Sequence, residues 1–284
     1  MNDNSNIKAA SRLGGRATIV TGAAQGFGEG IARALAENGA RLVIADLNEE
    51  LAAEVAASLN FEHGAGTAAA VKVNVADEES VKNLVEETVK IFGGIDLLVS
   101  NAGVLRAGGL DEMTLADFEF VTRINYTAFF LLAKHVSRVM KEQAAKDPSY
   151  SADIVQINSK SGLEGSAKNF AYAGGKFGGI GLVQSFAKEL VEHRIKVNAI
   201  CPGNFYEGPL WSDPEKGLFV QYLKAGKVPG AKTVKDVYDF YTSKVPMRRG
   251  CQPVDVARAV MYCVEQGYET GQAIPVTGGQ TMLS

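Results

Sequence analysis

Short β-branched segments alternate with longer segments rich in Ala, Leu, Glu and Lys along most of the chain, and this alternation restricts the possible folds strongly. The expected strands are mostly continuous apolar runs bounded by Gly or Asn, which is typical of parallel strands buried on both faces. Right-handed crossovers between them predict an α/β fold, a single domain with a doubly wound parallel sheet and helices on both faces. We expect strands at residues 17–21, 41–46, 69–74, 97–101, 153–158, 196–201 and 272–276, and helices at residues 27–38, 49–60, 78–92, 115–142, 172–193 and 254–265.

Two segments interrupt the alternation. Residues 1–15 begin with a polar stretch, and we expect them to form a disordered N-terminal arm ahead of the domain at 16–284. Residues 203–250 are too long for a simple connector, and they contain helix-like pieces at 214–225 and 233–242 with many aromatic side chains. We interpret residues 203–250 as a substrate-binding lid at the carboxyl edge of the sheet. A loop packed only on a neighbouring helix, or a subunit contact, is the alternative.

Composition excludes several classes of function. The chain of 284 residues has 29 Lys and Arg against 32 Asp and Glu, without the basic excess that nucleic-acid binding needs. No apolar run approaches the ~20 residues of a membrane span. The three cysteines and three histidines are widely spaced, with no disulfide or metal-ligand pattern. We therefore expect a cytoplasmic protein that acts on a small molecule, without a metal, nucleic-acid or membrane partner.

A glycine-rich turn follows the first expected strand and leads into a helix. Glycines there let the backbone approach a pyrophosphate, and the first amides of the helix form an anion site, although any tight turn can use glycine. Asp46 ends the second strand, where a carboxylate can accept both ribose hydroxyls and repel a 2′-phosphate. Because no basic residue stands beside it, we expect NAD rather than NADP. The residues expected at this part of the site are Gly22, Gln25, Gly26, Phe27, Gly28, Asp46 and Leu47.

Two further loops open at the same edge of the sheet. Asn74 and Val75 follow the third strand, and we expect Asn74 to pair with the adenine edge. Asn101, Ala102 and Gly103 follow the fourth strand, and their small side chains leave room for the cofactor. Either segment alone is also compatible with an ordinary loop.

Ser159, Tyr172 and Lys176 form the candidate catalytic group. Ser159 closes the fifth strand, and Tyr172 and Lys176 are four residues apart on one face of the next helix. A tyrosine acts as a general base near neutral pH if its pKa falls from ~10 to ~7, which requires about 4 kcal/mol. One ammonium ~4 Å away supplies about that much at an effective dielectric near 20. Ser159 would hold the reacting oxygen at the tyrosine.

The ordered motifs together resemble the short-chain dehydrogenase/reductase family, from about Arg16 to the C-terminus. This resemblance implies a Rossmann fold in which Tyr172 is the catalytic base and Lys176 its modulator and a ribose ligand. It also implies that Ser159 positions the substrate and that Asn125 anchors a water relay, whereas residue chemistry alone would make Asn125 a packing or kink residue. The family further implies a homotetramer with the helices near 115–142 and 172–193 at the interface. The motifs are Thr-Gly-x-x-x-Gly-x-Gly at 21–28, Asn-Ala-Gly at 101–103, Asn125, Ser159, Tyr172-x-x-x-Lys176 and Pro202-Gly203.

Within the family, the second half of the chain is most similar to members that act on a sugar alcohol phosphate. The segments concerned are 157–162, 176–179, 203–204, 244–246, 249–251 and 276–280. This similarity implies hydride exchange between sorbitol 6-phosphate and fructose 6-phosphate with NAD. The family often has a Thr that contacts the carboxamide in the turn after Pro-Gly, and Glu207 stands about there.

The substrate phosphate would be met by cations above Ser159 and Tyr172. The candidates are Lys160, Lys168 and Arg249, with Arg248 beside it, and solvation at the surface is the alternative for each. An unphosphorylated sugar, polyol or other secondary alcohol is the alternative substrate. A catalytically silent NAD-binding regulator is a further alternative, and the presence of the complete Ser, Tyr and Lys group argues against it.

Overall fold

The structure is a computed structural model that describes residues 13–224 and 226–282. In this part of the chain, seven parallel strands form one sheet in the order β3-β2-β1-β4-β5-β6-β7. The predicted fold class is thereby confirmed, and each observed strand lies within two residues of its predicted bounds. The strands are β1 (Ala17–Thr21), β2 (Arg41–Asp46), β3 (Ala68–Lys72), β4 (Leu97–Ser100), β5 (Ala152–Ile157), β6 (Ile195–Pro202) and β7 (Ala273–Val276).

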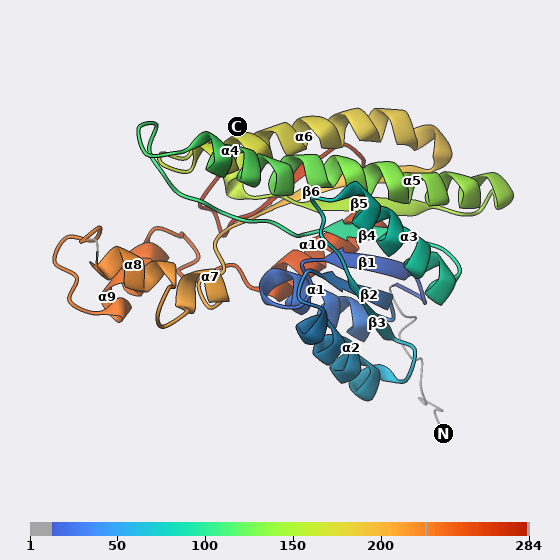
Figure 1. The fold of residues 1–284 in the computed structure, drawn as a ribbon, viewed down its shortest axis with the longest axis horizontal. Coiled ribbons are helices and arrows are strands. Elements are labelled where there is room, and N and C mark those ends of the chain that lie inside the picture. Colours follow the sequence, from blue (N-terminus) through green and yellow to red (C-terminus); the bar gives the residue numbers. More distant parts are fainter. Residues whose placement is uncertain (1–12, 225, 283–284) are drawn as a thin grey trace, which may run out of the picture.

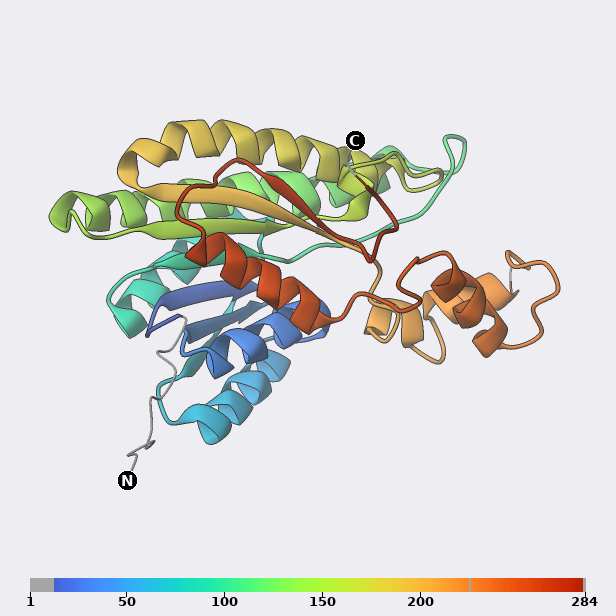
Figure 2. The same cartoon turned by 180° about the vertical axis from the view of Figure 1, so that it is seen from behind.

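Helices cover both faces of the sheet, because alternate apolar side chains of the strands point to opposite sides (Figures 1 and 2). Val20 and Ile44 pack on one side and Ile19 and Val43 on the other, all fully buried. One face carries α1 (Gly26–Glu37), α2 (Glu49–His63) and α10 (Pro253–Glu265), and the other carries α3 (Glu78–Phe92), α4 (Leu115–Thr122), α5 (Ala128–Lys146) and α6 (Phe170–Leu190). Within the described ranges, no helix combines the length and apolarity needed to cross a membrane.

The predicted helix at 115–142 differs from the structure in two respects, because one turn of π-helix at Arg123–Thr127 separates α4 from α5 and because α5 continues to Lys146. The buried Asn125 lies in this turn. Its Nδ2 donates to the carbonyl oxygens of Val121, at 3.0 Å, and Val104, at 2.7 Å. A side-chain amide that competes for a backbone carbonyl loosens the helical ladder, which explains the interruption.

Residues 203–250, which we term the lid because we predict that they cover the substrate, stand away from the rest of the molecule at the carboxyl end of β6 (Figures 1 and 2). Its helices are α7 (Pro209–Ser212), α8 (Leu218–Lys224) and α9 (Val234–Ser243). The predicted helix at 214–225 starts too early, because the Asp213 side chain accepts hydrogen bonds from the amides of Glu215 and Lys216 and forms a turn. The predicted helix at 233–242 agrees with α9 within one residue, and Thr233 caps it.

The predicted arm extends too far along the chain. Residues 1–12 lie outside the described residues. Leu13 is 1% exposed within the apolar cluster of α1, α2 and α10, and its amide donates to the carbonyl oxygen of Asn38 at 2.9 Å. Leu13 therefore belongs to the folded domain, because an apolar side chain and a backbone hydrogen bond both fix it there.

Candidate active site

The carboxyl ends of β1 and β4 meet where the order of strands reverses, which is the usual ligand crevice of a doubly wound sheet. The Asn101 side chain joins the two loops, because its Nδ2 donates to the carbonyl oxygens of Thr21, at 2.9 Å, and Gly22, at 3.1 Å. The Thr21 hydroxyl accepts from the amides of Asn101 and Ala102. The predicted segments after β1 and β4 thus form one surface.

The glycine turn fits a pyrophosphate. Gly22 and Gly26 both have φ of +64°, and a Cβ on Gly28 would lie 2.0 Å from the Gly22 carbonyl oxygen. The Gln25 side chain does not cap α1, so the first amides of this helix point into the crevice without a described side-chain partner. Free amides at a helix N-terminus bind anions. Phe27 packs on Phe205 of the lid, with ring centroids 5.1 Å apart.

Asp46 stands beside this turn at the end of β2. Its Oδ2 accepts from the amide of Ala24 at 3.0 Å, and its Oδ1 accepts from the amide of Asn48 at 3.0 Å. These two bonds hold the carboxylate against the glycine turn. Leu47 next to it is 65% exposed and apolar, so this position offers no positive charge.

The other predicted cofactor residues lie at the same edge of the sheet. Asn74 is exposed, and its Oδ1 accepts from the amide of Ala76 at 3.1 Å, while Val75 is buried beside it. Pro202 ends β6, and the amide of Gly203 donates to the Val276 carbonyl oxygen at 2.9 Å.

Ser159, Tyr172 and Lys176 converge at the end of β5. The Ser159 side chain lies next to the Tyr172 hydroxyl, and their interaction acts to lower the pKa of Tyr172. The Nζ of Lys176 lies 5.5 Å from the centroid of the Tyr172 ring and donates to the carbonyl oxygen of Ile157 at 2.9 Å. The helix spacing therefore places the ammonium beneath the phenol ring.

The pKa values of this group differ from the sequence-based expectation. Burial raises the pKa of Tyr172 above its usual value, and the hydrogen bond with Ser159 opposes this effect. Burial lowers the pKa of Lys176 to about 8. The expected lowering of the Tyr172 pKa by Lys176 is not found in this structure, because burial disfavours the charged form of both side chains and Lys176 donates to a backbone carbonyl. A Tyr172 base requires further positive charge in the crevice.

Asn125 lies next to this group. Its Oδ1 accepts from the amide of Val104 at 3.3 Å, so the π-turn holds the loop that follows β4. A Cβ on Gly103 would lie 2.8 Å from this Oδ1 and 3.8 Å from Lys176 Nζ. A side chain at position 103 would therefore clash with Asn125, and the expected place of Gly103 beside the cofactor stays a prediction.

Asn158, which the predicted site does not include, connects the end of β5 to α6. Its Nδ2 donates to the carbonyl oxygen of Lys176 at 2.9 Å, and its Oδ1 accepts from the amide of Ser159 at 2.8 Å. It is 3% exposed. A buried amide that ends an apolar strand directly before Ser159 was the available signal, since buried polar groups need partners.

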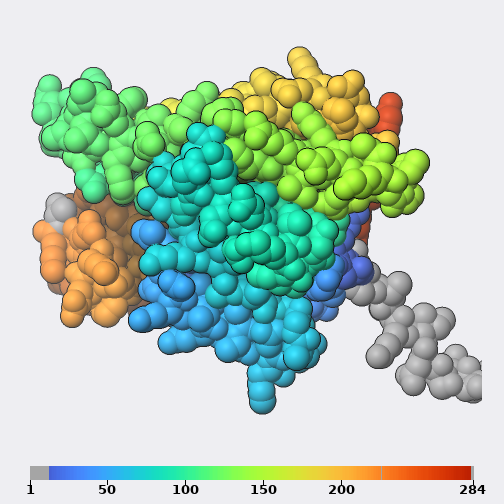
Figure 3. Space-filling model, turned by 45° about the vertical axis from the view of Figure 1, so that its right-hand side comes forward, coloured from blue at the N-terminus to red at the C-terminus, as the bar shows by residue number. Residues whose placement is uncertain are grey.

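The candidate cations for a phosphate lie in two places. Lys160 and Lys168 belong to the segment between Ser159 and Tyr172, and Lys160 pairs with Glu164 at 3.4 Å. Arg249 is held by both carboxylate oxygens of Asp255 on α10, so the structure does not bring it to Ser159. Arg248 beside it donates to the carbonyl oxygen of Ser243 at 2.8 Å. The lid and the loop before α4 project from the same end of the molecule (Figure 3).

Comparisons with known proteins agree with this geometry. A family model described as short chain dehydrogenase matches residues 16–213. Sorbitol-6-phosphate 2-dehydrogenase of Escherichia coli (strain K12) is 36% identical over 268 residues, which cover 93% of this chain and 98% of that protein. The 2,5-dichloro-2,5-cyclohexadiene-1,4-diol dehydrogenase LinX of Sphingobium indicum is 30% identical over 273 residues, which cover 95% of this chain and 98% of that protein.

The solved structures give the same result. The crystal structure of sorbitol-6-phosphate 2-dehydrogenase SrlD from Erwinia amylovora superposes with a TM-score of 0.86 at 36% identity. The match covers 94% of this chain and 100% of that chain. The chain is an oxidoreductase that belongs to the short-chain dehydrogenase family.

Proposed function

We propose that the protein is an NAD-dependent dehydrogenase of a sugar alcohol phosphate, which interconverts sorbitol 6-phosphate and fructose 6-phosphate. The observation that carries this proposal is the convergence of Ser159, Tyr172 and Lys176 beside a glycine turn that fits a pyrophosphate. The substrate class is supported by the sorbitol-6-phosphate 2-dehydrogenases that are 36% identical over most of the chain.

The preference for NAD is supported by Asp46. Its carboxylate is fixed at the end of β2 by two backbone amides, where it would accept the ribose hydroxyls and repel a 2′-phosphate. Bound NAD supplies the hydride acceptor and a positive charge. The glycine turn after β1, Asn74 and Val75 after β3, and Asn101 to Gly103 after β4 would form the rest of its site.

The residues of this chain would handle the proton of the reaction. Tyr172 accepts the proton of the substrate hydroxyl while the hydride leaves the carbon that carries this hydroxyl. Ser159 holds the hydroxyl oxygen beside the phenol. The Lys176 ammonium stabilises the phenolate, and its pKa of about 8 leaves it charged for the most part at neutral pH. Asn125 fixes the neighbouring loop and would anchor a relay that returns the proton to water.

Lys160 and Lys168 are the proposed phosphate ligands, because both lie in the segment between Ser159 and Tyr172. Arg249 would have to leave Asp255 to take part. We also propose a cytoplasmic homotetramer, in which the faces of α5 and α6 that expose Phe130 and Phe177 meet those of other subunits.

A panel of substrates tests the proposal. NADH formation is followed with sorbitol 6-phosphate, sorbitol and other secondary alcohols, each with NAD and with NADP. We expect kcat/KM for sorbitol 6-phosphate to exceed that for sorbitol at least ~10²-fold, since several charge-assisted hydrogen bonds act on the phosphate. Lys160→Gln should remove much of this ratio, whereas Lys216→Gln in the lid should leave it unchanged.

The panel also separates the alternatives. Equal efficiency with sorbitol and its phosphate would assign the protein to unphosphorylated alcohols. A higher kcat/KM with NADP would refute the role of Asp46. A complete lack of turnover together with NAD binding would support a regulator.

A further inference from the structure

Glu207 connects three parts of the molecule through one carboxylate. It lies in the first stem of the lid, residues 203–207, directly after β6. Its Oε1 accepts from the Tyr238 hydroxyl of α9 at 3.1 Å, and its Oε2 accepts from Nε2 of Gln252 at 2.7 Å. Gln252 is the N-cap residue of α10. The carboxylate therefore joins the first stem to the last helix of the lid and to a helix that covers the sheet.

The second stem of the lid, residues 245–251, runs beside the first. The amide of Cys251 donates to the Asn204 carbonyl oxygen at 2.8 Å. A Cβ on Gly250 would lie 3.1 Å from Glu207 Oε2 and equally close to the Tyr206 amide nitrogen, so a side chain at this position would crowd the two stems. Glu207 thus lies where both connections between the lid and the sheet come together.

The anchor of Glu207 on α10 is rigid. The Asp255 side chain accepts from the amide of Gln252 at 2.9 Å at the start of α10. Pro253 follows, and it packs so closely on α1 that a Cβ on Gly30 would lie 2.3 Å from the Pro253 Cβ. The contact of Glu207 with Gln252 therefore connects the lid, through α10, to α1, the helix that begins at the glycine turn.

We propose that Glu207 is a positioning residue that sets the orientation of the lid relative to the active site and thereby the affinity for the sugar alcohol phosphate. Both carboxylate oxygens accept from neutral side-chain donors, so in this arrangement Glu207 links parts of the protein to each other. This inference rests on the proposed function for the identity of the substrate. The claim that Glu207 orients the lid concerns only the lid and the helix α10.

Three variants test the inference. Glu207→Ala removes both bonds, Glu207→Gln keeps them because an amide accepts from Gln252 and donates to the Tyr238 oxygen, and Glu215→Ala removes an exposed lid carboxylate as a control. Tryptic cleavage of the folded protein at the exposed lid lysines, such as Lys227 and Lys232, measures how firmly the lid is held. Affinity for NADH is measured separately by titration without substrate.

We expect Glu207→Ala to accelerate lid cleavage about fivefold or more and to raise KM for sorbitol 6-phosphate about tenfold, since two hydrogen bonds to a charged group are lost. Its Kd for NADH should stay within about twofold of the wild-type value, because the glycine turn is untouched. Glu207→Gln and Glu215→Ala should behave like the wild type. Tyr238→Phe combined with Gln252→Ala should reproduce Glu207→Ala.

Two results would overturn the inference. A weaker Kd for NADH in Glu207→Ala, with lid cleavage unchanged, would place Glu207 at the cofactor. Unchanged cleavage, KM and Kd together would show that the two hydrogen bonds do not orient the lid. Cleavage and NADH binding need no substrate, so a failure of the proposed function, seen as no turnover of any polyol phosphate, is distinguishable from a failure of this inference.

Discussion

The sheet with its covering helices and the lid are stabilised by different kinds of side chain. Two clusters made mainly of Ala, Val, Leu and Ile fill the space between the sheet and its helices. The lid cluster is aromatic, with Trp211 at 5.0 Å from the rings of both Tyr206 and Phe219. The sheet is stabilised by strands that pair over long sequence distances, whereas the lid is stabilised by ring packing within residues 203–250. The contacts between the two regions are concentrated at the stems, where Phe27 packs on Phe205 and Glu207 bonds to Gln252.

The connection between the two regions is narrow, and this arrangement separates their tasks. The helices of the lid are short, α7 with 4 residues and α8 with 7, and helices of this length are unstable in isolation. The glycine turn and the Ser159, Tyr172 and Lys176 group lie on the sheet. Substitutions in the sheet should therefore change chemistry and cofactor binding, and substitutions in the lid should change substrate affinity.

The largest expected effect concerns the sheet. Tyr172→Phe removes the proton acceptor but keeps the ring over Lys176, so we expect kcat to fall ~10²- to 10⁴-fold or more. The Kd for NADH and the Trp211 fluorescence of the lid should remain those of the wild type. Steady-state kinetics and a fluorescence titration check both expectations. A variant that keeps more than about a tenth of the wild-type kcat would place the base elsewhere.

The second prediction concerns the lid. Trp211→Ala removes the ring at the centre of the aromatic cluster, a change that typically costs about 3–5 kcal/mol of local stability. We expect lid cleavage by trypsin to increase strongly and KM for the sugar alcohol phosphate to rise, with the Kd for NADH unchanged. Phe61→Ala is the control, because this aromatic side chain is 92% exposed at the end of α2. If NADH binding weakens in Trp211→Ala, the two regions are not separable.

The sequence predicts these two regions unequally well. Strand β1, helix α3 and the glycine turn follow from apolar periodicity and turn residues, which are local signals. The π-turn at Asn125 could not be predicted, because it depends on a contact with Val104 that only the folded loop provides. The start of α8 depends on the Asp213 turn, and the bond from Glu207 to Gln252 joins residues 45 positions apart. Such tertiary contacts produce no periodic pattern in the sequence.

The candidate site shows the same limit. The positions of Ser159, Tyr172 and Lys176 follow from an ordered motif, and the structure brings their side chains together. The raised pKa of Tyr172 does not follow from the motif, because it depends on how deeply the ring is buried. The pairing of Arg249 with Asp255 likewise depends on the packing of the second stem on α10.

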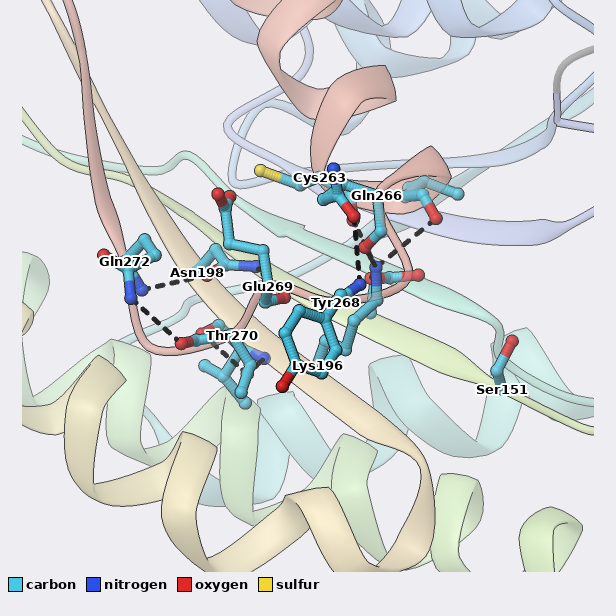
Figure 4. A network of polar contacts seen from close by, with 12 residues as sticks. Ser151, Lys196, Asn198, Cys263, Gln266, Tyr268, Glu269, Thr270 and Gln272 are labelled. Carbon is cyan, nitrogen blue, oxygen red and sulfur yellow. Dashed lines mark hydrogen bonds and ion pairs between the residues drawn. The ribbon is translucent and has the colours of Figure 1, made fainter.

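The smallest expected effect concerns a buried carboxylate on the sheet, far from the lid in sequence and in packing. Asp153 on β5 is 1% exposed and lies in register with Lys196 on β6. Its Oδ1 is 3.2 Å from Lys196 Nζ, and its Oδ2 is 3.4 Å from a guanidinium nitrogen of Arg16. Burial raises the pKa of Asp153 to about 6, although both cations oppose this shift. Lys196 also donates to the carbonyl oxygens of Cys263 and Gln266 at the end of α10 (Figure 4).

The pH dependence of stability follows from this shift. The folded-state pKa of about 6 lies above the unfolded value of ~3.9, so the unfolded chain loses this proton first as the pH rises. Stability from Asp153 is therefore present at low pH and is lost between about pH 4 and pH 6, with about 1 kcal/mol lost between pH 5 and pH 7. In Asp153→Asn this pH-dependent part of the free energy of unfolding disappears. Asp111→Asn, which changes an exposed loop carboxylate, should follow the wild type. Urea unfolding at both pH values measures the difference, and an equal pH dependence in Asp153→Asn and the wild type would contradict the raised pKa. Because Asp153 contacts no lid residue, tryptic cleavage of the folded lid should respond to pH alike in all three proteins once trypsin's own pH dependence is subtracted.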